Sequence, residues 1–93
     1  MVIKGFRHAG LRRFFEYDDG RRINANHRKK VRKILTRLHA AADLQDCDAP
    51  GLRLHPPKGD RKGEWGLDIT GNWRITFRWG DGDVYDVNYE DYH

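Results

Sequence analysis

Apolar side chains recur at helical spacing in the first half of the chain. Leu11, Phe14 and Phe15 fall on one side of a helix predicted over residues 9–17, and the Asp-Asp-Gly sequence at 18–20 ends it. A longer helix is predicted over 26–42. Its apolar stripe follows the i, i+3, i+4, i+7 spacing and must face a core: Val31, Ile34, Leu35, Leu38 and Ala42. Its other face is basic: Arg28, Lys29, Arg32, Lys33 and Arg37.

The second half of the chain alternates between apolar and polar residues. This pattern predicts strands over 64–70, 72–79 and 83–89. The residues predicted to share the apolar side are Trp65, Leu67 and Ile69, then Trp73, Ile75, Phe77 and Trp79, then Tyr85, Val87 and Tyr89. The connections Gly71-Asn72 and Asp81-Gly82 are predicted hairpin turns, because Gly and Asn tolerate positive φ.

Together these elements predict an α+β fold in which residues 1–93 form a single domain. Two N-terminal helices would pack on one face of a small, mainly antiparallel sheet. Weaker patterns predict short strands over 2–6 and 52–54, the second ended by the two prolines at 56–57, which cannot donate to a ladder.

Charge is distributed unevenly along the chain. Residues 1–42 hold twelve Lys and Arg against three acids, whereas residues 43–93 hold six against eleven. A half this basic indicates a polyanionic partner such as nucleic acid, although a solvated helix face is the plainer alternative. Arg28, Lys29 and Lys30 near the start of the second helix oppose its dipole. A bound phosphate would offset this cost, and so would salt screening or an earlier start of the helix.

Cys47 is the only cysteine, so no internal disulfide is possible and a reducing compartment fits best. We expect this thiol to be an inert buried group. The start of the chain has no apolar run long enough for a signal peptide or a membrane span. The sequence therefore predicts a cytoplasmic protein with no membrane partner.

Two clusters, at 55–61 and 89–93, hold the side chains that phosphodiester cleavage needs. Cutting RNA through its own 2′-hydroxyl requires a base, an acid and cations around the phosphorus. The candidates for proton transfer are His55, Asp91 and His93, with Tyr92 stacking on a base or bonding the phosphate, and the candidates for binding phosphate are Lys58, Arg61 and Arg74.

Each candidate has a plainer alternative. His55 beside prolines would be a surface residue, and Asp91 with His93 would be a charged chain end. Arg74 would be a cation–π partner of the preceding tryptophan, although the alternation predicts it on the face of the sheet without helices. A strand continuing past Tyr89 would direct Asp91 and His93 toward the core, at a cost in desolvation. We therefore expect the chain to bend after Tyr89.

Neither a metal site nor a cofactor is predicted. Five carboxylates lie close together near the end of the chain: Asp81, Asp83, Asp86, Glu90 and Asp91. The first two flank a hairpin tip, where acids are ordinary solvated turn formers. The sequence contains neither a metal-ligand spacing nor a G-x4-G-K-[ST] phosphate-binding pattern.

With these residues in view, the chain resembles a HigB-type toxin of the RelE/ParE superfamily, the killer halves of bacterial type II toxin–antitoxin pairs. Residues 3–11 match the pattern of this family, as do three motifs in the second half of the chain. The motifs that carry the resemblance are Leu54-His55-Pro56-Pro57-Lys58-Gly59-Asp60-Arg61, Gly71-Asn72-Trp73-Arg74-Ile75 and the terminal Asn88-Tyr89-Glu90-Asp91-Tyr92-His93.

The resemblance implies a microbial RNase fold and a metal-independent endonuclease that cuts mRNA in the ribosomal A site, leaving 2′,3′-cyclic phosphate and 5′-hydroxyl ends. The functional positions it implies are His55, Lys58, Arg74, Asp91, Tyr92 and His93. It implies a helix-turn-helix, HigA-like antitoxin, with operator DNA bound only through the toxin–antitoxin complex. The basic helix, with Arg28, Lys29 and Arg32, would dock on the RNA of the 30S subunit.

The chain departs from the family pattern at three positions. Gly66 lies where relatives often have a small polar residue, and Asp68 and Thr70 lie where some relatives carry a basic residue. If Thr70 replaces a phosphate-binding cation, Arg74 and Lys58 would carry more of the phosphate binding and the activity would be weaker. Two rival hypotheses are a non-catalytic toxin of the same superfamily that inhibits DNA gyrase, and a plain RNA-binding module without turnover.

Overall fold

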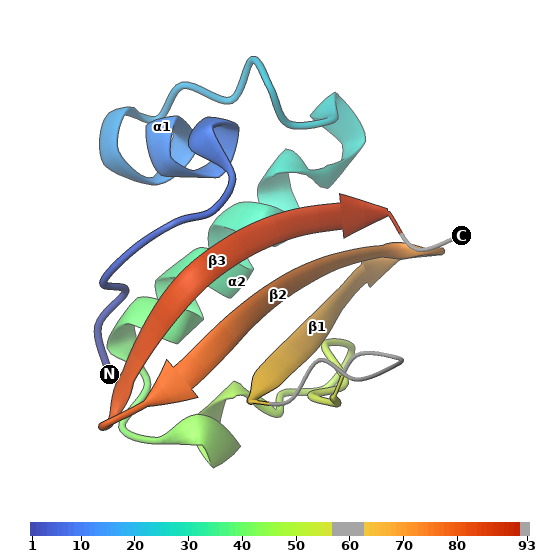
Figure 1. Cartoon of the computed structure of the whole chain (residues 1–93). Coiled ribbons are helices and arrows are strands. Elements are labelled where there is room, and N and C mark those ends of the chain that lie inside the picture. Colours follow the sequence, from blue (N-terminus) through green and yellow to red (C-terminus); the bar gives the residue numbers. More distant parts are fainter. Residues whose placement is uncertain (57–62, 92–93) are drawn as a thin grey trace.

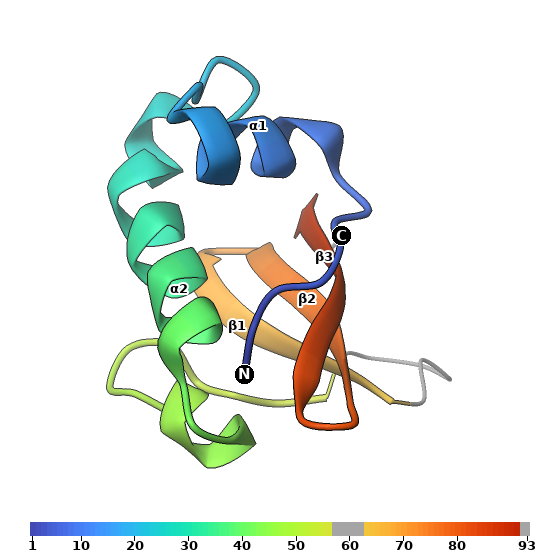
Figure 2. The ribbon, with the colours of Figure 1, turned by 90° about the vertical axis from the view of Figure 1, so that its left-hand side faces the viewer.

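The computed structural model describes residues 1–56 and 63–91, which form two helices followed by a three-stranded sheet (Figure 1). The elements are α1 (Ala9–Tyr17), η1 (Ala25–His27), α2 (Arg28–Ala40), η2 (Leu44–Cys47), β1 (Glu64–Thr70), β2 (Trp73–Gly80) and β3 (Asp83–Asp91), where η marks a 3-10 helix. The strands are antiparallel in the order β1-β2-β3. Both α-helices lie on one side of the sheet (Figure 2), which confirms the predicted α+β fold.

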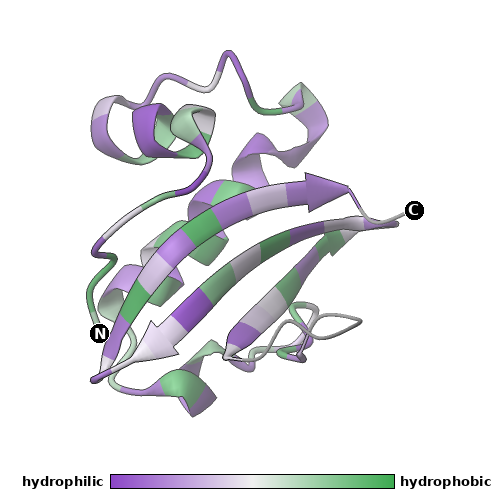
Figure 3. Cartoon of the chain, in the orientation of Figure 1, coloured by the Kyte–Doolittle hydropathy of each residue, from purple (hydrophilic) through white to green (hydrophobic). Residues whose placement is uncertain are grey.

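The core forms where the apolar stripe of α2 packs on the inner face of the sheet. Buried residues from the two sides are Val31, Ile34, Leu35 and Leu38 of α2, and Leu67, Ile75 and Phe77 of the sheet. Hydrophobic and hydrophilic residues alternate along much of each strand (Figure 3). Because successive strand residues point to opposite faces, the residues between the buried ones point away from the helices. We call that side the helix-free face; it carries Asp68, Arg74, Thr76 and Glu90.

The second helix is shorter than the predicted 26–42. It begins at Arg28, after the 3-10 turn η1, and ends at Ala40. Ala41 is extended, with φ −63° and ψ 143°, and is buried where the pattern predicted Ala42 to be buried. The backbone N–H of Ala42 donates to Asp46 Oδ2 at 2.9 Å, so this turn leads into η2 rather than continuing the helix.

The prediction that residues 2–6 and 52–54 form strands was wrong. Both segments nevertheless lie along edges of the sheet. Residues 2–7 run parallel to β3 with isolated bridges from Ile3 and Phe6, and the Lys4 N–H donates to the Val84 carbonyl at 2.7 Å. On the far edge, residues 52–55 make one antiparallel bridge to β1. Arg53 is in the left-handed region, with φ 49°, which interrupts an extended strand. Short irregular segments of this kind cover sheet edges that would otherwise be open to another chain.

The third strand contains a β-bulge that the alternation pattern did not predict. Arg78 pairs with Tyr85 but Thr76 pairs with Asn88, so two residues of β3 oppose a single residue of β2. Asp86 supplies the extra residue with φ 53°. The bulge reverses the alternation: Val84 and Val87 are both fully buried, and Tyr85 is 37% exposed. The prediction that Tyr85 shares the apolar side was therefore wrong.

Cys47 is fully buried, as predicted, and burial raises the pKa of its thiol to about 11. No helix in the described ranges is both long and apolar enough to cross a bilayer.

The first helix begins with a histidine cap. His8 Nδ1 accepts a hydrogen bond from the Leu11 N–H at 3.0 Å, which satisfies one of the unpaired donors of the first turn. Burial, and the positive charge of Arg22, hold the pKa of His8 below its ordinary value of 6.5. Both effects favour the neutral ring, and only a neutral ring can accept this bond.

We expect Asp86→Gly to raise the free energy of unfolding by about 0.5–1 kcal/mol, because glycine adopts positive φ without steric cost. Asn88→Gly in the same strand, where φ is not positive, should instead lower it. Urea unfolding followed by circular dichroism measures both changes. Destabilisation by both substitutions would contradict the bulge at Asp86.

The free energy of unfolding should fall as the pH is lowered from about 7 to about 5, with His8 contributing part of the change. Below pH 6.5 the His8 ring of the unfolded chain binds a proton. In the folded chain, whose His8 pKa is lower, the ring binds that proton only at lower pH. His8→Asn keeps a capping acceptor that does not titrate, so it should reduce this pH dependence. Urea unfolding of both proteins across this range gives the comparison, and identical pH profiles would refute the role assigned to His8.

Candidate functional site

The structure describes some of the predicted site residues but not others. His55, Arg74, Asp91, Arg28, Lys29 and Arg32 belong to the described ranges. The remaining predictions, Lys58, Arg61, Tyr92 and His93, lie outside the described residues.

Arg74 lies at the centre of a polar cluster on the helix-free face. It pairs in register with Asp68 of β1 and with Glu90 of β3. Its Nη1 is 3.2 Å from Asp68 Oδ1 and also donates to the Gly71 carbonyl at 3.2 Å. Only 12% of the Arg74 side chain is exposed, so its guanidinium is fixed in place by β2 and these neighbours.

His55 joins this cluster from the segment beside β1. Its Nδ1 is 2.6 Å from the carbonyl oxygen of Arg53, which accepts a hydrogen bond and so assigns the ring hydrogen to Nδ1. In the neutral ring, Nε2 is then free of hydrogen, and it lies 3.9 Å from Asp68 Oδ1. The ring lies over Gly66, which has no side chain to compete for the space. The structure therefore brings His55 and Arg74 together around Asp68.

Two residues of this cluster were not predicted as functional. Asp68 was noted only as a departure from the family pattern, yet it contacts both His55 and Arg74. Arg53 binds the other oxygen of Asp68 through Nε at 2.8 Å. The hairpin turn predicted at Gly71-Asn72 could have identified Asp68 as a neighbour of Arg74, because a short hairpin places the residues on either side of the turn opposite each other. No comparable local signal identifies Arg53.

Thr76 and Glu90 complete the helix-free face beside Arg74. The Thr76 hydroxyl is fully buried and donates to Glu90 Oε2. This bond orients Glu90, which lies cross-strand from Arg74. On this face a carboxylate of β1, a guanidinium of β2 and a carboxylate of β3 therefore lie side by side: Asp68, Arg74 and Glu90.

Asp91 lies on the other side of the sheet from Arg74. The predicted bend after Tyr89 was wrong, because β3 continues through Asp91, which pairs with Trp73. Strand alternation places Asp91 on the same side as Tyr89. Burial is the main reason that the pKa of Tyr89 is raised, and the negative charge of Asp91 adds to it. The core side is tolerable for Asp91 because the strand ends there and the residue is only partly buried.

An aromatic cluster fixes this end of β3 to the helices. The Trp73 and Tyr89 rings stack with centroids 4.6 Å apart, and His27 is 5.2 Å from Trp73. His27, which is 4% exposed, places Nδ1 2.6 Å from the Tyr89 hydroxyl. That hydroxyl also accepts the Asn24 N–H at 3.3 Å. The sequence pattern did not single out His27, since its role depends on a residue far along the chain.

The basic helix uses several of its cations internally. Arg28 Nε donates to the carbonyls of Gly20 at 2.8 Å and Ile23 at 3.2 Å. Arg32 pairs with Asp18 at 2.5 Å. In residues 1–56 and 63–91, Lys29 makes no hydrogen bond or ion pair and is exposed. Of the three predicted RNA-binding cations on this helix, Lys29 is the one without a structural contact in those ranges.

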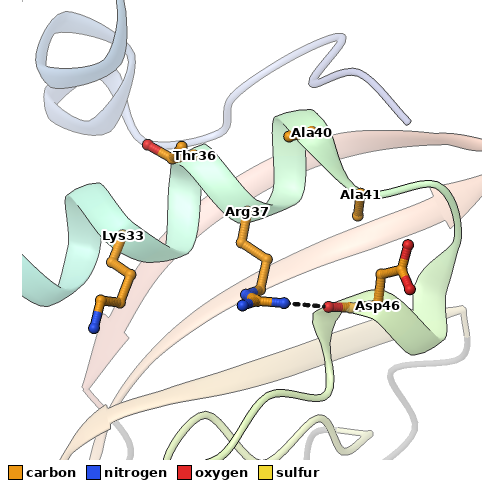
Figure 4. A pocket seen from close by; sticks show the side chains of 6 residues that line it. All are labelled: Lys33, Thr36, Arg37, Ala40, Ala41 and Asp46. Atoms are coloured by element: carbon orange, nitrogen blue, oxygen red, sulfur yellow. Dashed lines mark hydrogen bonds between the residues drawn. The ribbon is translucent and has the colours of Figure 1, made fainter.

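A pocket on the exposed side of α2 is separate from the polar cluster. It has a volume of about 480 Å³ and is lined by Lys33, Thr36, Arg37, Ala40, Ala41 and Asp46 (Figure 4). Arg37 donates to the Asp46 carbonyl at 2.7 Å across it. In the described part of the chain, no group of three His, Cys, Asp or Glu side chains is placed to hold a metal ion.

Comparison with known proteins gives two matches. A family model described as the RelE-like toxin of the type II toxin–antitoxin system HigB matches residues 4–93. The endoribonuclease HigB of Proteus vulgaris is 38% identical over 92 residues, an alignment that covers 99% of this chain and 100% of that protein.

Tyr89→Phe should lower the free energy of unfolding by about 1–3 kcal/mol, because it leaves the buried His27 nitrogen without its hydroxyl partner. Tyr85→Phe is the matched control, since the Tyr85 side chain is exposed and should tolerate the change. Thermal unfolding of both variants measures the difference. Equal stability of the two variants would show that the hydroxyl contributes nothing.

Proposed function

The chain belongs to the HigB-like family, the RelE-like toxins of type II toxin–antitoxin systems, and on that basis we propose that it is an endoribonuclease that cuts mRNA on the ribosome. The Proteus vulgaris relative is named an endoribonuclease, and the similarity extends over nearly the whole of both chains. As a member of this family the toxin has a cognate antitoxin.

The observation that carries the proposal is the grouping of His55 and Arg74 around Asp68 on the helix-free face. Arg74 offers a fixed guanidinium to a phosphate, and a guanidinium fork matches phosphate oxygens well. His55 has a ring nitrogen without hydrogen in its neutral form, and this nitrogen can accept a proton from a hydroxyl.

In the proposed reaction, the 2′-hydroxyl of the RNA attacks the neighbouring phosphorus. The bond from O2′ to phosphorus forms while the bond to O5′ breaks. A base takes the proton of the 2′-hydroxyl and an acid protonates the departing O5′, so the ends are a 2′,3′-cyclic phosphate and a 5′-hydroxyl. His55, Asp91, Tyr92 and His93 are the proposed proton-transfer and positioning groups. Lys58, Arg61 and Arg74 would hold the charge on the phosphoryl group.

In this proposal no step requires a metal ion, because the substrate supplies the nucleophile and side chains carry the protons. Asp91 lies on the opposite side of β3 from Glu90, so RNA would have to contact the end of the sheet as well as the helix-free face. At the end of β3 the RNA could contact both sides of the strand, and this end is the proposed position of the scissile phosphate.

The proposed partners follow from the family. The antitoxin would be a helix-turn-helix, HigA-like protein, and the pair would bind operator DNA together in the cytoplasm. The 30S A site would present the mRNA. Lys29, with Arg28 and Arg32 nearby, would contact ribosomal RNA, in keeping with the excess of cations in residues 1–42.

Primer extension on a defined mRNA in a purified translation system tests the proposal. Wild-type protein should make discrete cuts only when ribosomes are present, and His55→Ala and Arg74→Ala should each lower the cleavage rate about 100-fold or more. Varying the divalent metal within limits that keep ribosomes intact should leave the cuts unchanged.

Arg21→Ala is a suitable control for the loss of an arginine. Arg21 is an exposed residue that pairs with Asp19 in the loop after α1, away from the polar cluster. Intact mRNA with wild-type protein would reject the nuclease proposal and favour a non-catalytic toxin, for which inhibition of DNA gyrase is the next assay.

A further inference from the structure

Asp68 lies between two arginines that differ in their surroundings. Arg53 binds Asp68 Oδ2 at 2.8 Å from the outside, with 63% of its side chain exposed. Arg74 approaches Oδ1 at 3.2 Å from the adjacent strand and is mostly buried. His55 Nε2 is 3.9 Å from that same oxygen. Asp68 therefore shares its negative charge between a solvent-facing cation and the cation proposed to hold phosphate.

The formal charges of four described side chains around Asp68 cancel. Arg53 and Arg74 are opposed by Asp68 and Glu90, which gives a sum of zero for these side chains. Without Arg53 the sum would be −1, and both carboxylates would act on Arg74. A carboxylate without a paired cation repels a phosphate, so Arg53 lowers the repulsion that a polyanion meets as it approaches Arg74.

The backbone at Arg53 is held in an unfavourable conformation. Its φ of 49° lies in the left-handed region, which costs a non-glycine residue free energy. The exposed ion pair with Asp68 is a weak source of stability, so it gives little compensation. The same conformation directs the Arg53 carbonyl to His55 Nδ1. One strained residue thus orients His55 through its backbone and neutralises Asp68 through its side chain.

We propose that Arg53 is a positioning residue that neutralises Asp68, so that Arg74 keeps its charge available for an RNA phosphate. This rests on the proposed function, since RNA is the polyanion concerned. Arg53 acts through Asp68 and is not itself in contact with the reacting atoms. The role assigned to it is electrostatic, and it predicts a specific pattern among single and double variants.

The test compares wild type with Arg53→Gly, Asp68→Asn and the double variant. Glycine accepts the left-handed conformation and keeps the carbonyl that binds His55, so Arg53→Gly removes only the guanidinium. Asparagine keeps the shape of Asp68 without its charge. Thermal unfolding checks that each variant is folded, and the midpoint for Arg53→Gly should equal or exceed that of wild type. Arg21→Ala controls for removal of an exposed, ion-paired arginine.

Two readouts are measured for each protein. The first is the kcat and KM for cleavage of mRNA on purified ribosomes. The second is the affinity for a 2′-O-methyl RNA oligonucleotide, which cannot be cut through its 2′-hydroxyl. Arg53→Gly should weaken oligonucleotide binding and raise KM by roughly three- to tenfold, with Arg21→Ala close to wild type. The double variant should regain most of that affinity, and Asp68→Asn alone should bind at least as tightly as wild type.

The outcomes separate this inference from the proposed function. If the double variant binds no better than Arg53→Gly, or if Arg53→Gly binds like wild type, the electrostatic role of Arg53 is overturned. If wild type cuts no mRNA, the nuclease proposal fails, but the order of oligonucleotide affinities still decides the role of Arg53. A purely structural role would lower the unfolding midpoint of Arg53→Gly and would not be rescued by Asp68→Asn.

Discussion

Packing of the apolar stripe of α2 against the inner face of the sheet is the constraint from which the rest of the structure follows. Ile34, Leu35 and Leu38 are buried against a sheet whose own inner residues include Ile75 and Phe77. Side chains alternate along a strand, so this packing also decides which residues leave the core. A slip of one residue would direct Arg74 into the core and Ile75 into water, which the cost of burying a charge excludes. The polar cluster on the helix-free face is thus a consequence of the core.

The same alternation divides the candidate chemistry between two sides of the sheet. Arg74 and His55 meet around Asp68 on the helix-free face, whereas Asp91 lies on the side of Tyr89 and the aromatic cluster. The bulge at Asp86 lies before this end of β3, and pairing from Asn88 to Asp91 is regular again. The end of β3 is therefore held in register by β2 and anchored to the helices through Tyr89, which gives Asp91 a defined position.

Positive charge in the first half of the chain has more than one use. Arg28 and Lys30 bind backbone carbonyls, and Arg32 is paired with Asp18, so these cations stabilise the loops around α2. Lys30 Nζ, for example, donates to the Ile69 carbonyl at 2.7 Å and so ties α2 to the end of β1. The excess of cations in residues 1–42 overstates what is available to a polyanion, because charge counted along a sequence takes no account of internal pairing.

The sequence by itself determined the features that depend on local spacing: the apolar stripe of α2, the two hairpin turns, the α+β class and the motifs that place the chain in its family. The tertiary structure decided four others: the bulge that turns Tyr85 outward, the left-handed conformation of Arg53, the bond between His27 and Tyr89, and the continuation of β3 to Asp91. Hydrophobic periodicity indicates which side of an element faces the core. It does not reveal one inserted residue or a partner 62 positions away. Asp68 illustrates the division. The hairpin places it opposite Arg74, but only the folded chain brings Arg53 and His55 to its other side.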